Sequence, residues 1–180
     1  MPTSARVDVG IDPYSEGDTV FLEGRAIAPG TGHAEGRRLL EQMYLRHVGS
    51  PMPAVLVSPR GKPYFDGSPW HFSISHTKAH VFCALSCKEI GIDAEEGDRQ
   101  INLKLAHQIL SPEELTRFRE SEDKRLALLK LWVLKEAQGK LLGEGIKFHP
   151  NHTNFSPDDP RVTVLQGCLV AVIEEEDHVI

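Results

Sequence analysis

The sequence lacks any uninterrupted apolar run near the roughly 20 residues needed to cross a bilayer, and its start, MPTSARVDVG, has no apolar signal core. It also lacks a basic excess, because 20 Lys and Arg stand against 26 Asp and Glu, for a formal net charge of −6. Phosphate backbones need a basic face, so non-specific nucleic-acid binding is disfavoured. We therefore expect a cytoplasmic protein that binds neither membranes nor nucleic acids, and an anionic ligand would need local cations or a metal.

Cysteine is scarce, with three residues and no CxxC pair. Cys83, Cys87 and Cys168 lie within or beside apolar segments, which predicts small core thiols rather than a disulfide framework or a zinc site. The segment HPNH at 149–152 has two histidines, but it has neither a partner cysteine nor an HExxH helix. A zinc site is therefore not expected there either.

No low-complexity tract, visible internal repeat or linker rich in Gly, Ser or Pro divides the 180 residues. Apolar residues make up 40% of the chain and charged residues 26%, which is typical of a folded globular protein. A chain of this length can bury a core as one domain or as two small halves packed together. We expect a single domain over residues 1–180.

The hydrophobic pattern predicts strands mixed with separate helices. One helix is expected over 32–48, where apolar residues recur at helical spacing before Gly49. Ser111 and Glu114 form a capping-box pattern that starts a second helix, and a third is expected over about 123–142. Strands are predicted within TVFLEGRAI, in AVLVS at 54–58, as an antiparallel meander of HFSIS, VFCALS and EIGIDAE, and as a hairpin of RVTVLQG and CLVAVIEEE. The expected fold class is α+β.

Acidic side chains gather on one predicted strand and one predicted helix. In IGIDAE a strand places Asp93 and Glu95 on the same face, and in the third helix the 100° step aligns Trp132, Glu136 and Lys140 along one stripe. A hard cation such as Mg²⁺ takes carboxylate oxygens and completes its octahedron with water and substrate phosphate. If the three carboxylates converge, their mutual repulsion favours a cation between them.

Each of these features also has an ordinary structural explanation. An acidic pair at a strand end is more often a solvated face, and a Lys-Glu pair on a helix is usually surface charge. Trp132 is more often core packing than a binding platform, and His76 would by default be an exposed turn histidine. Periodicity alone names no substrate.

Taken together, the segments resemble the Sfp-type 4'-phosphopantetheinyl transferases in order and spacing. FSISHTK at 72–78 is similar to the family's Phe-x-x-Ser-His segment, GIDAE at 91–95 to its Gly-Ile-Asp-x-Glu motif, and WVLKEAQGK at 132–140 to its Trp-x-x-Lys-Glu-Ala-x-x-Lys motif. GKPYF at 61–65 and LSPEEL at 110–115 resemble further family segments. The resemblance covers about residues 60–145, and the two paired motifs in this order are highly specific.

The resemblance implies roles for seven residues, each by its matching position. The metal-binding acids correspond to Asp93, Glu95 and Glu136, and the coenzyme A phosphate contacts correspond to Lys62, Ser75, His76 and Lys140. Mg²⁺ is the implied metal, with Mn²⁺ as an alternative, and coenzyme A is the co-substrate. Glu136 is the candidate base or orienting group and Lys140 a source of positive charge, so both are predicted to be catalytic.

The implied fold is a pseudo-dimer of two similar α+β halves, about 1–88 and 89–180, each with antiparallel sheet and packed helices, and with coenzyme A in the cleft between them. The implied reaction transfers 4'-phosphopantetheine from coenzyme A to a serine of an apo acyl or peptidyl carrier protein and releases adenosine 3',5'-bisphosphate. We expect a monomer, although the sequence leaves the oligomeric state and the identity of the carrier open.

Alternatives of other classes stay open. The chain can be a non-catalytic module that binds coenzyme A or a carrier protein, or a metal-dependent pyrophosphatase that uses water as the nucleophile. Arg37 and Arg38 are either N-terminal phosphate contacts or solvated helix charges. Carrier domains are generally acidic, so the basic residues near the motifs are a candidate docking patch or simply mixed helix surface: Lys104, Arg117, Arg119, Lys124, Arg125 and Lys130.

Overall fold

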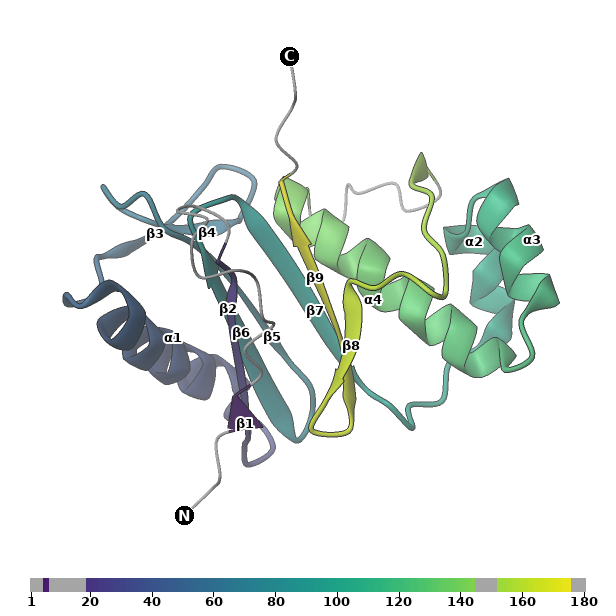
Figure 1. Ribbon diagram of the computed structural model, residues 1–180, viewed down its shortest axis with the longest axis horizontal. Coiled ribbons are helices and arrows are strands. Elements are labelled where there is room, and N and C mark those ends of the chain that lie inside the picture. The colour runs from purple at the N-terminus through teal and green to yellow at the C-terminus, as the bar shows by residue number, and fades with distance from the viewer. Residues whose placement is uncertain (1–4, 7–18, 145–151, 176–180) are drawn as a thin grey trace.

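Two antiparallel sheets lie at the centre of the molecule, whose computed structural model describes residues 5–6, 19–144 and 152–175 (Figure 1). The first sheet has the order β1-β2-β6-β5 and consists of β1 (Ala5–Arg6), β2 (Phe21–Ala26), β5 (His71–His76) and β6 (His80–Ser86). The second has the order β7-β9-β8 and consists of β7 (Ile90–Glu96), β8 (Val162–Leu165) and β9 (Cys168–Glu174). A separate ribbon pairs β3 (Val55–Val57) with β4 (Pro63–Phe65).

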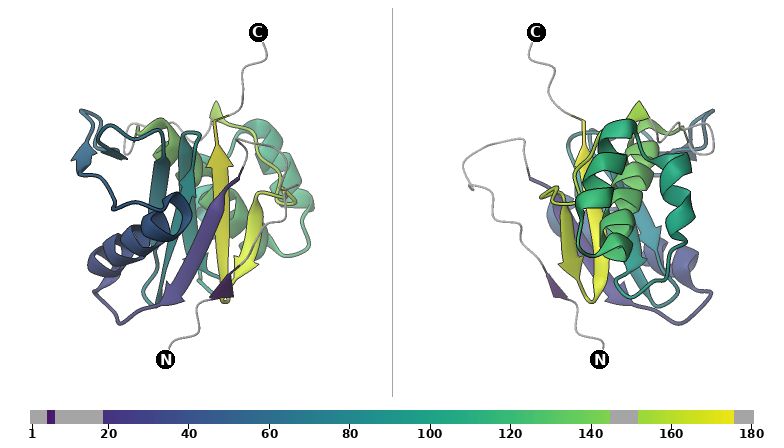
Figure 2. Two further views of the ribbon diagram at one scale, coloured as in Figure 1. Left: turned by 60° about the vertical axis from the view of Figure 1, so that its left-hand side comes forward. Right: turned by 90° about the vertical axis from the view of Figure 1, so that its right-hand side faces the viewer.

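Helices cover the outer faces of the two sheets. On one side lies α1 (Gly32–Val48), and on the other lies α4 (Lys124–Leu142) with two shorter helices, α2 (Ala106–Ile109) and α3 (Pro112–Glu120), and the 3-10 turn Leu103–Leu105 (Figure 2). No helix among the described residues is both long and apolar enough to cross a membrane. Strands mixed with separate helices make this an α+β fold, as predicted.

The alternation of side chains along β6 and β9 explains the layers. In β6, Cys83 and Leu85 pack against α1, whereas Phe82 faces the second sheet. In β9, Leu169 and Ala171 pack against α4, whereas Val170 faces the first sheet. Each sheet is therefore buried on both faces, and the order of layers is α1, first sheet, second sheet, α4.

The capping predictions are confirmed. The side chain of Ser111 accepts the N–H of Glu114, and the carboxylate of Glu114 accepts the N–H of Ser111, which completes the capping box of α3. Asp123 caps α4, and Gly49 and Gly143 end α1 and α4 in the left-handed conformation. The terminal hairpin of β8 and β9 is also confirmed.

Three expectations need correction or completion. The meander of 71–95 is wrong in part, because β6 pairs with β2 on its far side and β7 leaves to pair with β9. Cys87 is exposed rather than in the core, because it lies in the turn after β6. The strand β4 and the helical residues 103–109 were not predicted. Residues 149–151 of the HPNH segment lie outside the described residues. His152, the last residue of the segment, is described and is exposed.

The two sheets are built on the same chain path. The first runs β2, α1, β5, β6 with the order β2-β6-β5, and the second runs β7, α4, β8, β9 with the order β7-β9-β8. Each path carries one insertion. In the first, β3 and β4 lie between α1 and the hairpin of β5 and β6; in the second, α2 and α3 lie between β7 and α4. All pairings within both sheets are antiparallel.

Two serine hydroxyls connect the sheets where β5 runs beside β7. The N–H of Ile92 donates to Ser73 Oγ at 3.0 Å, and the N–H of Ala94 donates to Ser75 Oγ at 3.1 Å. These buried N–H groups would otherwise lack a partner on that edge of β7, since the opposite edge is paired with β9. Side chains thus replace a backbone ladder and fix how the two sheets meet.

Gly91 allows α4 to lie directly on β7. A Cβ at this position would lie 2.1 Å from the carbonyl oxygen of Ala137 and 2.4 Å from the backbone nitrogen of Leu141. Backbone atoms in the middle of a helix cannot move aside as a flexible side chain can. The absence of a side chain at Gly91 therefore sets the distance between the GIDAE strand and the helix that carries Glu136 and Lys140.

We predict that Gly91→Ala costs more than the typical overpacking penalty of about 1–3 kcal/mol, because the added methyl meets backbone atoms of both Ala137 and Leu141 in α4. Urea denaturation followed by circular dichroism measures the change in the free energy of unfolding. Cys87→Ala, at an exposed turn, is the control and should change stability by no more than about 0.5 kcal/mol. A Gly91→Ala protein as stable as the parent would show that α4 can shift away from β7.

Candidate active site

A cavity of about 800 Å³ opens between the two layers of helices, above the line where β5 and β7 meet. Its walls come from the start of α1, the ribbon of β3 and β4, strands β5 and β7, and the last turns of α4. The lining includes all seven residues singled out from the sequence: Lys62, Ser75, His76, Asp93, Glu95, Glu136 and Lys140. Segments up to 78 residues apart thus contribute to one cavity.

Asp93 lies at the base of the acidic side of this cavity. It is buried, and its Oδ1 accepts a hydrogen bond from Ser75 Oγ at 3.1 Å and another from Lys140 Nζ at 2.8 Å. Ser75 comes from β5 and Lys140 from α4, so one carboxylate oxygen collects donors from two different layers. The ion pair with Lys140 offsets part of the cost of burying the Asp93 carboxylate.

Glu95 and Glu136 complete the acidic side. Partial burial raises the pKa of Glu95, and the negative charges of Asp93 and Glu136 add to the rise, although Arg99 and a hydrogen bond from Trp132 oppose it. Burial and the charge of Asp93 likewise raise the pKa of Glu136, against the opposing charge of Lys140. The charge of Asp93 therefore acts on both glutamates, and all three carboxylates line the same cavity.

The donor set suits a hard divalent cation, since carboxylate oxygens are the ligands that Mg²⁺ and Mn²⁺ prefer. Among the described residues, only His80, Glu96 and Cys168 bring three ligand atoms all within 4.8 Å of one another. The carboxylates of the cavity are thus spaced more widely, and Lys140 and Arg99 neutralise part of their charge. A cation between them would relieve the repulsion that raises the two glutamate pKa values.

The opposite side of the cavity is basic and includes two histidines. The exposed ring of His76 packs over Gly32, where an added Cβ would lie 2.5 Å from the ring, and it meets His33 edge-on at 5.3 Å between ring centroids. Lys62 lines the cavity, but its ammonium pairs with Glu89 and donates to the carbonyl oxygen of Leu141 at 2.8 Å. Lys62 would therefore have to give up partners to reach a ligand.

The structure also adds cationic residues that the sequence left undecided or did not suggest. Arg37 lines the cavity, whereas Arg38 pairs with Glu35 at 2.6 Å and does not line it. Arg60, one residue before the GKPYF segment, lines the cavity as well. The sequence could have distinguished Arg37 from Arg38 only through their positions around α1. That distinction requires knowledge of which face of α1 is buried.

Known proteins are similar in sequence to parts of this chain. A family model described as the 4'-phosphopantetheinyl transferase superfamily matches residues 89–175. Among curated relatives, the 4'-phosphopantetheinyl transferase psf-1 of Bacillus pumilus is 31% identical over 122 residues, which cover 62% of this chain and 52% of that protein. The 4'-phosphopantetheinyl transferase gsp of Aneurinibacillus migulanus is 29% identical over 115 residues, with 62% and 48% covered, and Sfp of Bacillus subtilis is 33% identical over 89 residues, with 48% and 39% covered.

The match to the 4'-phosphopantetheinyl transferase superfamily is thus confined to residues 89–175 of the chain. It spans about half the length of the curated relatives it matches. The matched segment holds β7 with Asp93 and Glu95, and α4 with Glu136 and Lys140. The histidines and Lys62 come from outside the region that the superfamily model matches.

Within the superfamily segment, Lys135 has a structural position rather than a place in the cavity. Its ammonium pairs with Glu114 at 2.8 Å and donates to Thr153 Oγ1 at 3.0 Å, and both Lys135 and Glu114 are fully buried. Burial lowers the pKa of Lys135, and Glu114 opposes the shift. Glu114 also accepts the N–H of Phe155 at 2.7 Å. The pair therefore joins α3, α4 and residues 153–155 behind the cavity.

We predict that Glu136→Gln raises the thermal midpoint at pH 7 when divalent ions are chelated. The pKa of Glu136 is raised above its ordinary value of 4.5, so the folded protein holds this proton more tightly than the unfolded chain. The group therefore lowers stability as the pH rises through the window above 4.5, and the gain from Glu136→Gln should vanish as the pH falls below it. Differential scanning calorimetry at several pH values measures this.

Glu120→Gln, on the exposed surface of α3, is the matched control and should not change the midpoint. A lower midpoint for Glu136→Gln at pH 7 without divalent ions would mean that attraction to Lys140 outweighs burial and repulsion at this carboxylate. That outcome would contradict the electrostatic account of the site.

Proposed function

We propose that this protein transfers 4'-phosphopantetheine from coenzyme A to a serine of an apo acyl or peptidyl carrier protein, with Mg²⁺ as the cofactor. The observation that carries the proposal is the cavity in which Asp93, Glu95, Glu136 and Lys140 face a histidine and arginine side. The match of residues 89–175 to the superfamily model supports the reaction type. The cavity volume of about 800 Å³ lies within the range of cofactor-sized pockets.

The two sides of the cavity would divide the binding of coenzyme A between them. Mg²⁺, when bound by Asp93, Glu95 and Glu136, would neutralise negative charge on the pyrophosphate. Lys140 adds a cation on the same side, and His76 and Arg37 can meet phosphate oxygens from the α1 side. Ser75 already donates to Asp93, so it can donate to a phosphate only when the Asp93 carboxylate takes another partner.

In the proposed step, the serine oxygen of the carrier protein forms a bond to the β-phosphorus of coenzyme A, and the bond from that phosphorus to the oxygen of the leaving adenosine 3',5'-bisphosphate breaks. The serine proton passes to a base. Glu136 is the candidate, because its carboxylate lines the cavity between Asp93 and Lys140. Lys140 is positioned to stabilise charge on the transferred group.

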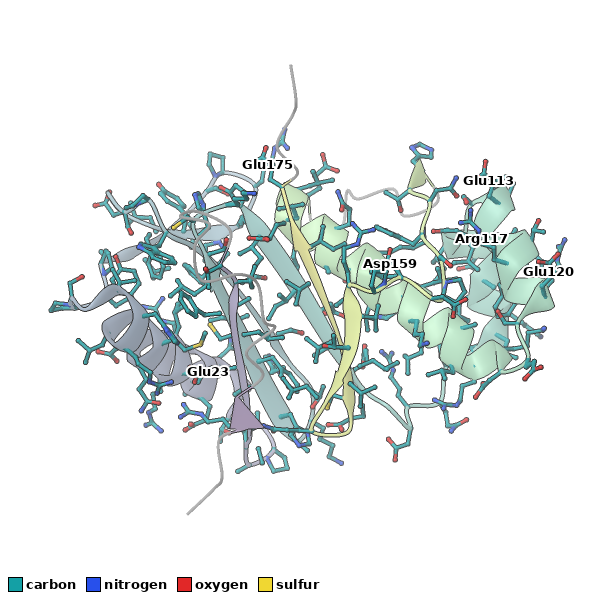
Figure 3. All side chains as sticks on the ribbon, in the orientation of Figure 1. Glu23, Glu113, Arg117, Glu120, Asp159 and Glu175 are labelled. Carbon is teal, nitrogen blue, oxygen red and sulfur yellow. The ribbon has the colours of Figure 1, made fainter. Side chains whose placement is uncertain are left out.

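We also propose that the fold is a pseudo-dimer with halves near 1–88 and 89–180. The shared strand order and chain path of the two sheets support this. Buried acids add to the support: Glu23 of β2 points toward α1 and pairs with Arg46 and His47 near the end of that helix (Figure 3), just as Asp93 of β7 pairs with Lys140 near the end of α4. The monomeric state and the cytoplasmic location stay predictions.

We predict that incubation with coenzyme A, Mg²⁺ and an apo carrier domain adds one phosphopantetheine to the carrier, as measured by intact-protein mass spectrometry, and that EDTA prevents it. Asp93→Asn and Glu136→Gln should each reduce the rate at least 100-fold, because each replaces a negatively charged carboxylate of the site with a neutral amide. Glu120→Gln on α3 is the control with full activity.

The products also separate the alternatives. Free 4'-phosphopantetheine without modified carrier would support a pyrophosphatase with water as the nucleophile. Coenzyme A binding by calorimetry without any product, across acyl and peptidyl carriers, would support a non-catalytic binding module. Full activity of Asp93→Asn would overturn the proposed metal ligands.

Basic residues of the 104–130 region are the proposed docking side for an acidic carrier. Arg117 projects from α3 close to Glu113 and Glu120, at the end of the molecule away from α1 (Figure 3), and its guanidinium donates to the carbonyl oxygen of Phe155 at 2.9 Å. Arg125 donates to the carbonyl oxygens of Gly97 and Arg99. These two arginines therefore have structural contacts, which makes the exposed Lys104 and Arg119 cleaner probes.

We predict that the charge reversals Lys104→Glu and Arg119→Glu together raise the KM for the carrier several-fold, and more at low salt, with little change in kcat or in the KM for coenzyme A. Steady-state kinetics at two ionic strengths measures this. Thr116→Glu is the control, because it adds one negative charge at an exposed position of α3, the helix that carries Arg119. It separates the loss of these two cations from a general change in net charge. An unchanged KM for the carrier would exclude this docking side.

A further inference from the structure

A second group of ligand-type side chains lies on the other face of β7 from the cavity. Glu95 faces the cavity, and its neighbour Glu96 faces the layer between the two sheets, as strand alternation requires. Glu96 meets His80 at the start of β6 and Cys168 at the start of β9. The turns that precede these two strands lie at the same end of the sheets (Figure 1).

The three side chains are close enough to share one ion. His80 Nδ1 lies 3.3 Å from Glu96 Oε1, Cys168 Sγ lies 3.5 Å from His80 Nδ1, and Cys168 Sγ lies 3.4 Å from Glu96 Oε2. One ligand atom from each residue lies within 4.8 Å of the other two. Tetrahedral zinc, with bonds of about 2.3 Å to sulfur and about 2.0–2.1 Å to nitrogen or oxygen, separates its ligand atoms by roughly 3.3–3.6 Å. The 3.5 Å between Cys168 Sγ and His80 Nδ1 matches the nitrogen–sulfur separation, and each of these two atoms has one oxygen of Glu96 at 3.3–3.4 Å.

The surrounding residues hold the ligands in place. Thr77, in the turn before His80, donates its hydroxyl to Glu96 and accepts the N–H of His80 at 3.0 Å. The ring of His80 stacks near that of Phe82, with centroids 6.2 Å apart, at the edge of the core between the sheets. Partners of this kind orient a ligand and fix its geometry. Cys168 is buried, whereas His80 and Glu96 are partly exposed and leave a path to solvent.

The ligand types differ from those of the cavity. Asp93, Glu95 and Glu136 offer oxygen alone, which suits Mg²⁺, whereas a thiolate, an imidazole and one carboxylate suit zinc. Local spacing gave no sign of this group, because its members come from three strands and lie at positions 80, 96 and 168. This is why the sequence predicted only a core thiol at Cys168.

We propose that His80, Glu96 and Cys168 form a zinc site, separate from the magnesium site, with water as the fourth ligand. In the metal-free protein, burial and the neighbouring Glu96 raise the pKa of the Cys168 thiol to about 12, and the thiol donates to Glu96. Zinc binding would form the metal–sulfur bond and release the thiol proton to solvent. The bound ion would join the β5–β6 turn to β7 and β9, and so connect the two sheets.

Cobalt(II) titration of the metal-free protein in the presence of excess Mg²⁺ tests this site. A thiolate bound to cobalt gives a near-ultraviolet charge-transfer band that carboxylate ligands do not give. We expect that band at a ratio of one cobalt per chain, together with the visible bands of a tetrahedral ion, and we expect zinc to abolish both. Cys168→Ser should lose the charge-transfer band, whereas Cys87→Ser, with its exposed thiol, and Asp93→Asn, in the cavity, should keep it.

Two further results decide the matter if Cys168→Ser does not fold. Glu96→Gln should weaken cobalt binding at least tenfold, and zinc should raise the thermal midpoint of the parent protein but not that of Glu96→Gln. Absence of the charge-transfer band in the parent, or its loss in Cys87→Ser, would overturn the proposal. The readouts do not depend on transferase activity, so the zinc site and the proposed function can fail separately.

Discussion

The rest of the structure depends on how β5 meets β7. The two strands belong to different sheets, and the N–H groups of Ile92 and Ala94 donate to the hydroxyls of Ser73 and Ser75. A buried N–H without a partner costs about 1–3 kcal/mol, so these two contacts strongly favour one register between the sheets. The same register places Ser75 beside Asp93, and it thereby joins the seam between the sheets to the chemistry of the cavity.

The second constraint is the position of α4 over β7. Gly91 lets the helix backbone approach the strand, and the buried Lys135–Glu114 pair ties the helix to α3 on its other side. On the helix held in this way, Glu136 and Lys140 line the cavity. A buried ion pair contributes little net stability, but breaking it is costly, so it favours one arrangement of these helices over others.

Strand β7 contributes side chains both to the cavity and to the proposed zinc site because its side chains alternate. Asp93 and Glu95 face the cavity with its oxygen ligands, and Glu96 faces the mixed nitrogen and sulfur ligands of the proposed zinc site. The two groups also differ in where their partners originate: the cavity draws on α1 and α4, and the other group on the turns between paired strands. One ordered strand thus couples the seam between the sheets to both groups.

The sequence alone determined the local elements and the cavity's principal residues. The helices over 32–48, 112–120 and 124–142 follow from periodicity and capping residues, which act over a few positions and can be read directly. Family resemblance selected seven residues that do line one cavity. Tertiary structure decided what depends on distant contacts: that β7 leaves the meander, that the two sheets repeat one path without visible sequence repetition, that Lys135 is buried while Arg37 faces the cavity, and that Cys168 meets His80 and Glu96. These outcomes depend on which strand edges and helix faces remain available after packing, and no short-range pattern contains that information.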